Sequence, residues 1–284
     1  MCDSAPTCRL LPFTVRDGAL NMGIDEALLL SCLAGGPALT LRLYGWARPT
    51  LSLGYFQESP ANDRVEASLP TVRRLTGGGA IIHDAELTYS LAWRYTRSPS
   101  HGEGRGESID SAGDGVLSDC GAVALGCGMN IPTGVAASYA HINTALAAGL
   151  QRLGLEPGPP VTGGRPRDFL CFARRSRHDL VVNGNKVVGS AQRRRHGAVL
   201  QHGSILVRPS AVRGIPERSI SELIGRAVSL EEAADAIAEA FEKHLGWRLV
   251  PDRLSIDEGH LAEGLRHHKY DHLSWGGRRR TRPT

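Results

Sequence analysis

Hydrophobic and polar residues alternate through much of the first half of this chain, after one helical stretch near its start. Residues 19–33 place leucine and isoleucine on one helical face, and Gly35-Gly36-Pro37 ends that pattern. The short apolar runs that follow are typical of β-strands. Strands are expected at 39–44, 50–55, 72–74, 80–83 and 87–95. A short helix is expected at 60–67, between the second and third of these strands.

The second half begins with a segment that has no sustained period. Residues 98–134 are rich in Gly, Ser and Asp, which predicts a long loop or an insertion. Beyond it, the expected elements are a helix at 137–153 and strands at 178–182, 186–192 and 198–207. Asn183-Gly184 separates the first two of these strands and favours a tight primed turn, so we expect a hairpin there.

The C-terminal third is mainly helical, and two capping boxes mark where its helices begin. Each box places a serine three residues before a glutamate: Ser229 with Glu232, and Ser255 with Glu258. The expected helices are 230–245 and 256–270. Because strands fill the middle of the chain and helices its ends, we expect an α+β fold with a mixed, mainly antiparallel sheet flanked by helices.

The length and composition favour one large domain. The chain has 284 residues, and 41% of them are hydrophobic, enough for an ordinary core. We expect a single catalytic domain over 19–275, an N-terminal segment at 1–18 and a basic, disordered tail at 276–284. The sequence contains neither a signal-peptide pattern nor an apolar run long enough to cross a bilayer, which predicts a cytoplasmic protein without a membrane partner.

The charge is modest, with a net value of +4, but the arginines cluster at 174–177, 193–195 and 278–280. No aromatic stacking pattern or helix-turn-helix signal accompanies them, so an acidic protein partner is favoured over a nucleic acid. The six cysteines are scattered without a Cys-x-x-Cys pair or a zinc-like spacing. They are expected to be free thiols, and no metal site is expected.

The segment from Arg73 to Asp84 is the most informative stretch. It joins two arginines, the glycines Gly77, Gly78 and Gly79, and His83 between two strand-like runs. Consecutive glycines allow a positive φ or a close approach to a ligand, and arginine offers a rigid fork of donors. This combination favours a site for an anionic, acyl-bearing ligand. The alternative is a tight turn whose arginines are merely solvated.

Three ordered blocks together resemble the lipoate-protein ligase and octanoyltransferase family. The blocks are Arg73-Arg74-x-Thr-Gly-Gly-Gly-Ala-x-x-His83-Asp84, Asn183-Gly-Asn-Lys186-Val-Val-Gly-Ser-Ala-Gln192 and Leu200-Gln-His202-Gly-Ser-Ile-Leu206. Flanking segments that also look like this family are Asn21 to Glu26, Arg42 to Trp46, Leu53 to Gln57, Lys269-Tyr270 and Trp275. The resemblance runs roughly from residue 20 to 275 and is poor only in the 98–134 segment.

The resemblance implies the catalytic fold of biotin and lipoate ligases, with an acyl tunnel lined from the glycine block. The residues that it places in substrate binding are Arg73, Arg74, Gly77, Gly78, Gly79, His83, Gly189, Ser190 and His202. Lys186 matches the lysine that the family uses to hold the acyl carbonyl, and a compact cation there can stabilise a developing oxyanion. His83 is open to three roles: an orienting residue, a proton acceptor for the incoming lysine, or a satisfied polar group at a strand end.

The family holds two chemistries, and Cys171 decides between them. Ligases activate free lipoate with ATP, whereas one transferase branch takes octanoate from acyl carrier protein through a cysteine thioester. Cys171 lies before the hairpin that carries Lys186, as in that branch, and the arginines at 174–177 would favour its thiolate. The alternative for Cys171 is a small buried apolar side chain.

We therefore expect a catalytic Cys171 and Lys186, and transfer of an octanoyl or lipoyl group to a lysine of a lipoyl-accepting domain. Acyl carrier protein would be the donor, and the glycine cleavage H protein or the E2 subunit of a 2-oxoacid dehydrogenase the acceptor. No cofactor would be needed. The alternatives are a ligase that uses ATP and magnesium, an amidotransferase between lipoyl domains, and a non-catalytic acyl-binding module.

Overall fold

The computed structural model describes residues 5–59, 68–95, 130–159, 169–172, 176–212, 218–272 and 275. The short helix expected at 60–67, most of the 98–134 segment, the expected tail and Arg174-Arg175 lie outside the described residues. Within the described part of the chain, no helix is both long and apolar enough to cross a membrane.

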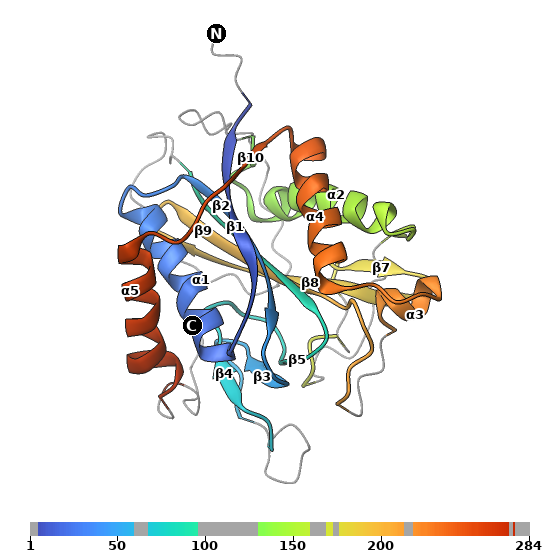
Figure 1. The fold of residues 1–284 in the computed structure, drawn as a ribbon, viewed down its shortest axis with the longest axis horizontal. Helices are drawn as coiled ribbons and strands as arrows, with labels where there is room; N and C mark the ends of the chain where they lie inside the picture. The colour runs from blue at the N-terminus through green and yellow to red at the C-terminus, as the bar shows by residue number, and fades with distance from the viewer. Residues whose placement is uncertain are drawn as a thin grey trace.

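A seven-stranded sheet forms the centre of the molecule (Figure 1). Its strands, in sheet order, are β10 (Arg248–Pro251), β1 (Thr7–Arg16), β2 (Leu39–Trp46), β6 (Leu87–Arg94), β9 (Ala198–Ile205), β8 (Asn185–Arg195) and β7 (Leu180–Val182). β1 is parallel to both of its neighbours, and the other four pairs are antiparallel. The expected α+β fold with a mixed, mainly antiparallel sheet is confirmed.

A second, three-stranded sheet carries the glycine block. Its order is β4 (Thr71–Arg73), β3 (Thr50–Leu53) and β5 (Ile81–His83). β3 is parallel to β4 and antiparallel to β5, so the loop from Arg74 to Ala80 crosses from one side of β3 to the other. Gly78 in this loop has a φ of +95°, a conformation that favours glycine.

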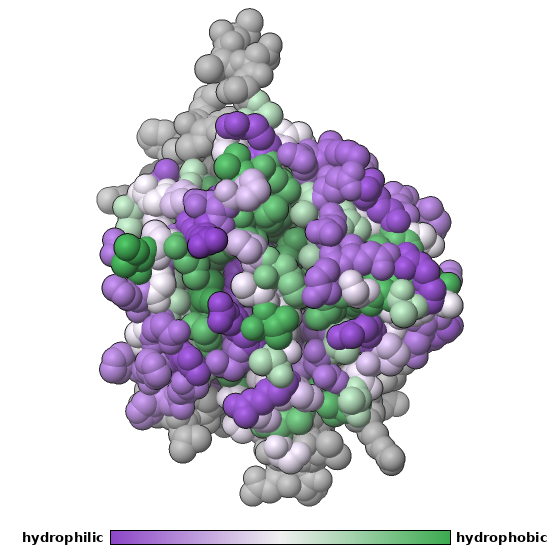
Figure 2. Space-filling model, in the orientation of Figure 1, coloured by the Kyte–Doolittle hydropathy of each residue, from purple (hydrophilic) through white to green (hydrophobic). Residues whose placement is uncertain are grey.

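Helices cover both faces of the large sheet (Figure 1). They are α1 (Gly18–Leu33), α2 (Val135–Arg152), α3 (Ile220–Ile224), α4 (Leu230–Leu245) and α5 (Ile256–Leu265), the last continued by one π-helical turn, η2 (Arg266–Tyr270). α2 packs against α4, and α1 packs against α5. Figure 2 shows hydrophilic residues over the helices at the two sides of the view and hydrophobic residues in the middle.

Successive side chains of β2 point to opposite faces of the sheet, and a different set of helices covers each face. Leu39, Leu41 and Leu43 join the core cluster that contains residues of α2 and α4. Tyr44 and Trp46 point to the opposite face, where they pack with Ala19 and Met22 of α1. The α1 face is therefore the one on which the smaller sheet, through Val72 of β4, meets the large one.

The turns and helix caps agree with those expected from the sequence, with two differences. Asn183 and Gly184 both have positive φ, 47° and 78°, as a primed hairpin turn requires. The Ser255 box is complete, whereas Ser229 caps α4 without a returning bond, because Arg226 binds the carboxylate of Glu232. A third box, Ser219 with Glu222, was missed and begins α3.

Two strands of the large sheet, β1 and β10, are not predicted from the sequence. Pro12 interrupts the apolar pattern of β1, and its pairing with β2 shifts register between Leu11 and Thr14. Residues 7–16, which we assigned to an N-terminal segment, thus form a strand between β10 and β2. β10 has only four residues, too few for a period to emerge.

A buried ion pair fastens β1 to the start of α5. The Arg9 guanidinium donates to both carboxylate oxygens of Glu258, at 2.8 and 2.7 Å, and the two side chains are 8% and 4% exposed. Burial alone would raise the pKa of Glu258, but hydrogen bonds from Arg9, Ser255 and Ser31 together with the charge of Arg9 lower it from 4.5 to about 2.

Replacing Glu258 by Gln should therefore destabilise the fold, because Arg9 would keep a buried charge without its partner. A lowered pKa stabilises the folded state above the ordinary value of 4.5, and this contribution is lost as the pH falls to about 2. The expected loss at pH 7 is on the order of 3 kcal/mol. Urea unfolding at several pH values should show the difference between wild type and variant shrinking within that window; a pH-independent difference would contradict the assignment.

Candidate active site

A pocket lies between the two sheets, on the α1 face of the larger one. The large sheet lines it with Tyr44, Trp46, Thr88, Gly189, Ser190, Ala191, His202, Gly203 and Ser204. The smaller sheet and its loop contribute Ser52, Arg74, Gly78, Ile81 and His83, while Met22 comes from α1 and Cys171 from the segment before β7. Of the predicted site residues, Arg74, Gly78, His83, Cys171, Gly189, Ser190 and His202 thus share one pocket.

Cys171 is held at the pocket by backbone contacts with the end of the glycine block. Its N–H donates to the carbonyl of Ala80 at 2.6 Å, and the N–H of Ala80 donates to Phe169 at 2.9 Å. The Cys171 side chain packs beside the buried Ile81 and Phe172 and is partly exposed. It is therefore open to a reactant while its position is fixed from both sides.

Lys186 brings a buried positive charge to Cys171. Its Nζ lies 3.8 Å from the Cys171 Sγ and donates to the Cys171 carbonyl at 3.1 Å, and its side chain is 2% exposed. Asp179 pairs with the same Nζ at 3.0 Å and also accepts from the N–H of Ser176. A Cβ at Gly189 would lie 2.9 Å from the Lys186 Cε, so the glycine makes room for the lysine stem.

The two arginines of the glycine block, Arg73 and Arg74, donate hydrogen bonds to backbone carbonyls and are buried. The alternative of a tight turn with solvated arginines is therefore excluded. Arg74 is 2% exposed and donates to the carbonyls of Ser52, Gly77 and Gly79, with its Nε directed at the Thr76 hydroxyl. All its N–H groups are engaged once the Ser52 hydroxyl is included. The guanidinium is the centre around which the loop closes.

Arg73 lies outside the pocket lining, although the resemblance placed it in substrate binding. Its Nη1 donates to the carbonyls of Gly54, Tyr55 and Gln57, and its Nε donates to the carbonyl of Trp275. The Trp275 indole donates back to the Arg73 carbonyl at 2.8 Å. The contacts of Arg73 fasten the loop after β3 and a residue near the C-terminus to β4.

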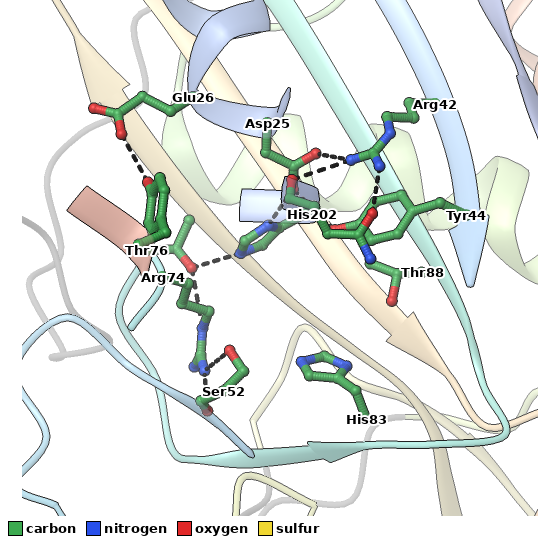
Figure 3. A network of polar contacts seen from close by, with 12 residues as sticks. Asp25, Glu26, Arg42, Tyr44, Ser52, Arg74, Thr76, His83, Thr88 and His202 are labelled. Atoms are coloured by element: carbon green, nitrogen blue, oxygen red, sulfur yellow. Dashed lines mark hydrogen bonds and ion pairs between the residues drawn. The ribbon is translucent and has the colours of Figure 1, made fainter. Parts of the chain in front are cut away.

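His202 lies in the middle of a buried polar chain (Figure 3). Its Nδ1 is 3.0 Å from the Asp25 carboxylate, and its Nε2 is 2.7 Å from the Thr76 hydroxyl. Arg42 and the Tyr44 hydroxyl also donate to Asp25, at 2.8 and 2.9 Å. Burial favours a raised pKa for Asp25, but the His202 hydrogen bond and the Arg42 charge outweigh it and lower that pKa.

His83 belongs to a second polar group, separate from that of His202. Its Nδ1 contacts Glu86, which also accepts hydrogen bonds from Thr88 and Ser204. The imidazole stacks on Trp46, with ring centroids 3.8 Å apart and planes 9° apart. Burial is the largest cause that lowers the pKa of His83, ahead of the raising effect of Glu86, so the ring is neutral at pH 7.

Sequence reasoning missed much of the pocket wall. Met22, Tyr44 and Trp46 lie in segments 21–26 and 42–46, which resemble the family, but the sequence alone indicates no role for these side chains. Asp25 and Glu86 are each 2% exposed, but the sequence around them, with Glu26 and Asp84 close by, does not signal their burial. Asp84, the last residue of the glycine block, anchors a loop by accepting from the Ser210 hydroxyl and the Ala211 N–H.

Comparison with known proteins identifies the family. Residues 17–104 and 108–242 match the model of the lipoyl protein ligase A/B catalytic domain, so the chain belongs to that family. Similar curated relatives are octanoyltransferase LipM of Kyrpidia tusciae, 35% identical over 91% of this chain and 94% of the relative, and octanoyltransferase LipM of Symbiobacterium thermophilum, 35% identical over 95% and 98%.

Solved structures of lipoate-protein ligases share the fold. Lipoate-protein ligase A bound with ATP has a TM-score of 0.69 at 23% identity, covering 95% of this chain and 98% of that one. Ta0514, a putative lipoate protein ligase from T. acidophilum with bound lipoic acid, has a TM-score of 0.69 at 22% identity and covers 96% and 100%. The expected lipoate-ligase-like catalytic fold is confirmed.

The backbone at Gly54 comes close to the glycine loop, a contact that the sequence did not signal. A Cβ there would lie 2.2 Å from the carbonyl oxygen of Gly78, so Gly54→Ala must displace the loop. We expect a loss of roughly 1–3 kcal/mol in unfolding free energy. Gly264→Ala on α5 is the control, because its Cβ meets nothing within 4 Å and alanine favours the helix by roughly 0.5–1 kcal/mol. Equal effects in chemical denaturation would contradict the close approach.

Proposed function

We propose that this protein is an octanoyltransferase of protein lipoylation, which moves an octanoyl or lipoyl group to a lysine of a lipoyl-accepting domain through a thioester on Cys171. One observation carries the proposal: the Cys171 Sγ lies 3.8 Å from the buried Lys186 Nζ, at a pocket with apolar walls. The curated relatives named octanoyltransferase LipM support the reaction.

In the first half-reaction, the Cys171 sulfur attacks the carbonyl of an acyl thioester. A new carbon–sulfur bond forms at Cys171, and the bond to the donor sulfur breaks, so the donor leaves as a thiol with the proton that Cys171 gave up. The carbonyl oxygen gains negative charge in between, and a buried cation in contact with Cys171 can stabilise it. Lys186 is that cation, and Asp179 positions it from 3.0 Å.

In the second half-reaction, a neutral amine of the acceptor lysine attacks the Cys171 thioester. An amide bond forms, the carbon–sulfur bond breaks, and the proton released by the amine returns to the Cys171 sulfur. Cys171 is partly exposed, so an acceptor side chain can reach it from solvent. Both steps exchange one acyl bond for another and consume no nucleotide.

The pocket suits an acyl chain. At about 0.8 kcal/mol per buried CH₂, an eight-carbon chain gains roughly 5 kcal/mol on entering an apolar slot. The N–H groups of Arg74, which could have held a phosphate, already bind loop carbonyls and hydroxyls. ATP and magnesium would enter only for a ligase, an alternative raised by the fold shared with lipoate-protein ligase A.

Acidic protein substrates fit the exposed basic residues of the described chain. Arg177 and Arg195 are exposed, and Arg193 lies over the Tyr55 ring at 5.3 Å. Such charges raise encounter rates with acidic partners. We propose acyl carrier protein as donor and the glycine cleavage H protein or an E2 lipoyl domain as acceptor, with the reaction in the cytoplasm. One structural relative was solved as an archaeal ligase with its E2 lipoyl domain.

Mixing the protein with octanoyl-acyl carrier protein should add one octanoyl group, detected by intact mass, and Cys171→Ala should abolish the adduct. Cys8→Ala is the matched control, because Cys8 is fully buried and burial raises its pKa to about 12, which keeps the thiol protonated. An adduct that persists in Cys171→Ala would overturn the thioester mechanism.

Acceptor modification separates the remaining alternatives. If acceptor labelling by Cys171→Ala required ATP and free lipoate, the protein would be a ligase. If the wild type moved the acyl group only from one lipoyl domain to another, it would be an amidotransferase. If it bound octanoyl donors without any transfer, the protein would be a non-catalytic acyl-binding module.

Lys186→Met should keep the pocket and slow both half-reactions, because the side chain keeps its length and loses its charge. We expect a fall in the rate of thioester formation on the order of 10²–10³. The rate of thioester formation is measured by stopping the acylation reaction at successive times and analysing the protein by mass spectrometry. Thermal melting checks that the variant is folded. Asp179→Asn is the companion variant, which should slow the reaction less because the cation remains; a Lys186→Met rate equal to wild type would remove Lys186 from the chemistry.

A further inference from the structure

The short segment that carries Cys171, residues 169–172, is a strand of neither sheet. Its backbone meets the glycine block at Ala80. The Ala80 N–H donates to the Phe169 carbonyl at 2.9 Å, and the Cys171 N–H donates to the Ala80 carbonyl at 2.6 Å, which makes a single parallel bridge to Leu170. Two hydrogen bonds to one residue fix a point of the segment but not its direction, so the position of the sulfur depends on further contacts.

Gln57 supplies one of these contacts from the loop after β3. Its Nε2 donates to the Phe169 carbonyl at 3.0 Å, so that carbonyl accepts hydrogen bonds from two sides. Its Oε1 accepts from the Gly54 N–H at 2.9 Å. The Gly54 N–H can only donate and the Phe169 carbonyl can only accept, which fixes the orientation of the amide. A side chain at this position must therefore offer a donor and an acceptor together.

The backbone that carries the Gln57 side chain is itself held firmly. Residues 54–57 form a turn, closed by a hydrogen bond from the Gln57 N–H to the Gly54 carbonyl at 3.0 Å. The Arg73 guanidinium donates to the carbonyls at both ends of this turn, at 2.9 and 2.6 Å. Because the turn is fixed to β4 in this way, the Gln57 amide is a stationary point against which the Cys171 segment is held.

The far end of the same segment is held from the large sheet. The Lys186 Nζ donates to the Cys171 carbonyl at 3.1 Å and lies 3.8 Å from the Cys171 Sγ. Gln57 binds the carbonyl two residues earlier, so the two side chains hold the segment on either side of the Ala80 bridge. A rotation of the segment about that bridge would change the distance between Sγ and Nζ, and the Gln57 hydrogen bond opposes such a rotation.

We infer that Gln57 is a positioning residue for Cys171: its amide holds the Phe169 carbonyl and thereby keeps the sulfur beside the Lys186 Nζ. The inference rests on the proposed function, because it assumes that Cys171 reacts at this place. Gln57 is half-buried and is not among the residues that line the pocket, so it acts through the segment and not on the acyl group. Its loss should slow the chemical step and leave donor binding unchanged, because a small displacement of a reacting atom slows a reaction steeply.

Gln57→Met tests this role, since it removes both hydrogen bonds of the amide and keeps the length of the side chain. Thioester formation is followed by intact mass at several concentrations of octanoyl-acyl carrier protein, which separates the maximal rate from the half-saturating donor concentration. The maximal rate should fall on the order of tenfold. The half-saturating concentration should stay within about twofold of wild type. Gln151→Met is the matched control: this exposed glutamine on α2 donates to the Glu156 side chain, and both values should stay unchanged.

Gln57→Glu tests the donor alone, because the carboxylate keeps an acceptor for the Gly54 N–H and turns its other oxygen toward the Phe169 carbonyl. Two facing acceptors repel, so this variant should be at least as slow as Gln57→Met. If Gln57→Met does not fold by thermal melting, Gln57→Glu decides the matter. A wild type that forms no adduct would defeat the proposed function itself. A wild type that forms the octanoyl adduct, with folded Gln57 variants that keep its maximal rate, would overturn the positioning role alone.

Discussion

The Arg74 guanidinium is the interaction on which the site depends. Its N–H groups draw the carbonyls of Ser52, Gly77 and Gly79 and two hydroxyls to one buried point. Without that charge, several carbonyls would be buried near one another with no donor, which is costly in a low dielectric. The loop that it shapes carries Thr76 to His202 on the large sheet and leads into Ala80, which holds Cys171. One cation therefore connects the two sheets and the segment that carries Cys171.

The polar groups around the pocket lie in three places. Lys186 and Asp179 lie beside Cys171, and the Asp25–His202–Thr76 chain connects α1 and the large sheet to the loop of the smaller sheet. Glu86 gathers His83, Thr88 and Ser204 away from the sulfur. The polar atoms of these groups contact one another, and apolar atoms make up most of the pocket surface between them.

The sequence predicted the fold class and the positions of most strands and helices, and it named seven of the sixteen residues that line the pocket. Periodicity sufficed for α1, the Ser229 cap marked the start of α4, and Asn183-Gly184 defined its hairpin, because local chemistry decides such features. β1 escaped because Pro12 breaks its pattern, and β10 because its pairing with β1 is contributed from 241 residues away. The role of Arg73 as a backbone anchor and the stacking of Trp46 on His83 depend on contacts between distant segments, which spacing does not encode.

Cys171 belongs to neither sheet: it lies on a short segment that touches the glycine block through the backbone of residue 80. The two sheets, the rest of the pocket lining and the loop arginine are built without it. A scaffold arranged in this way can gain or lose the thiol while the rest of the pocket stays intact. A family whose relatives are named both lipoate-protein ligase and octanoyltransferase would then need few changes to hold both, because Cys171 stands apart from the sheets that build the rest of the pocket.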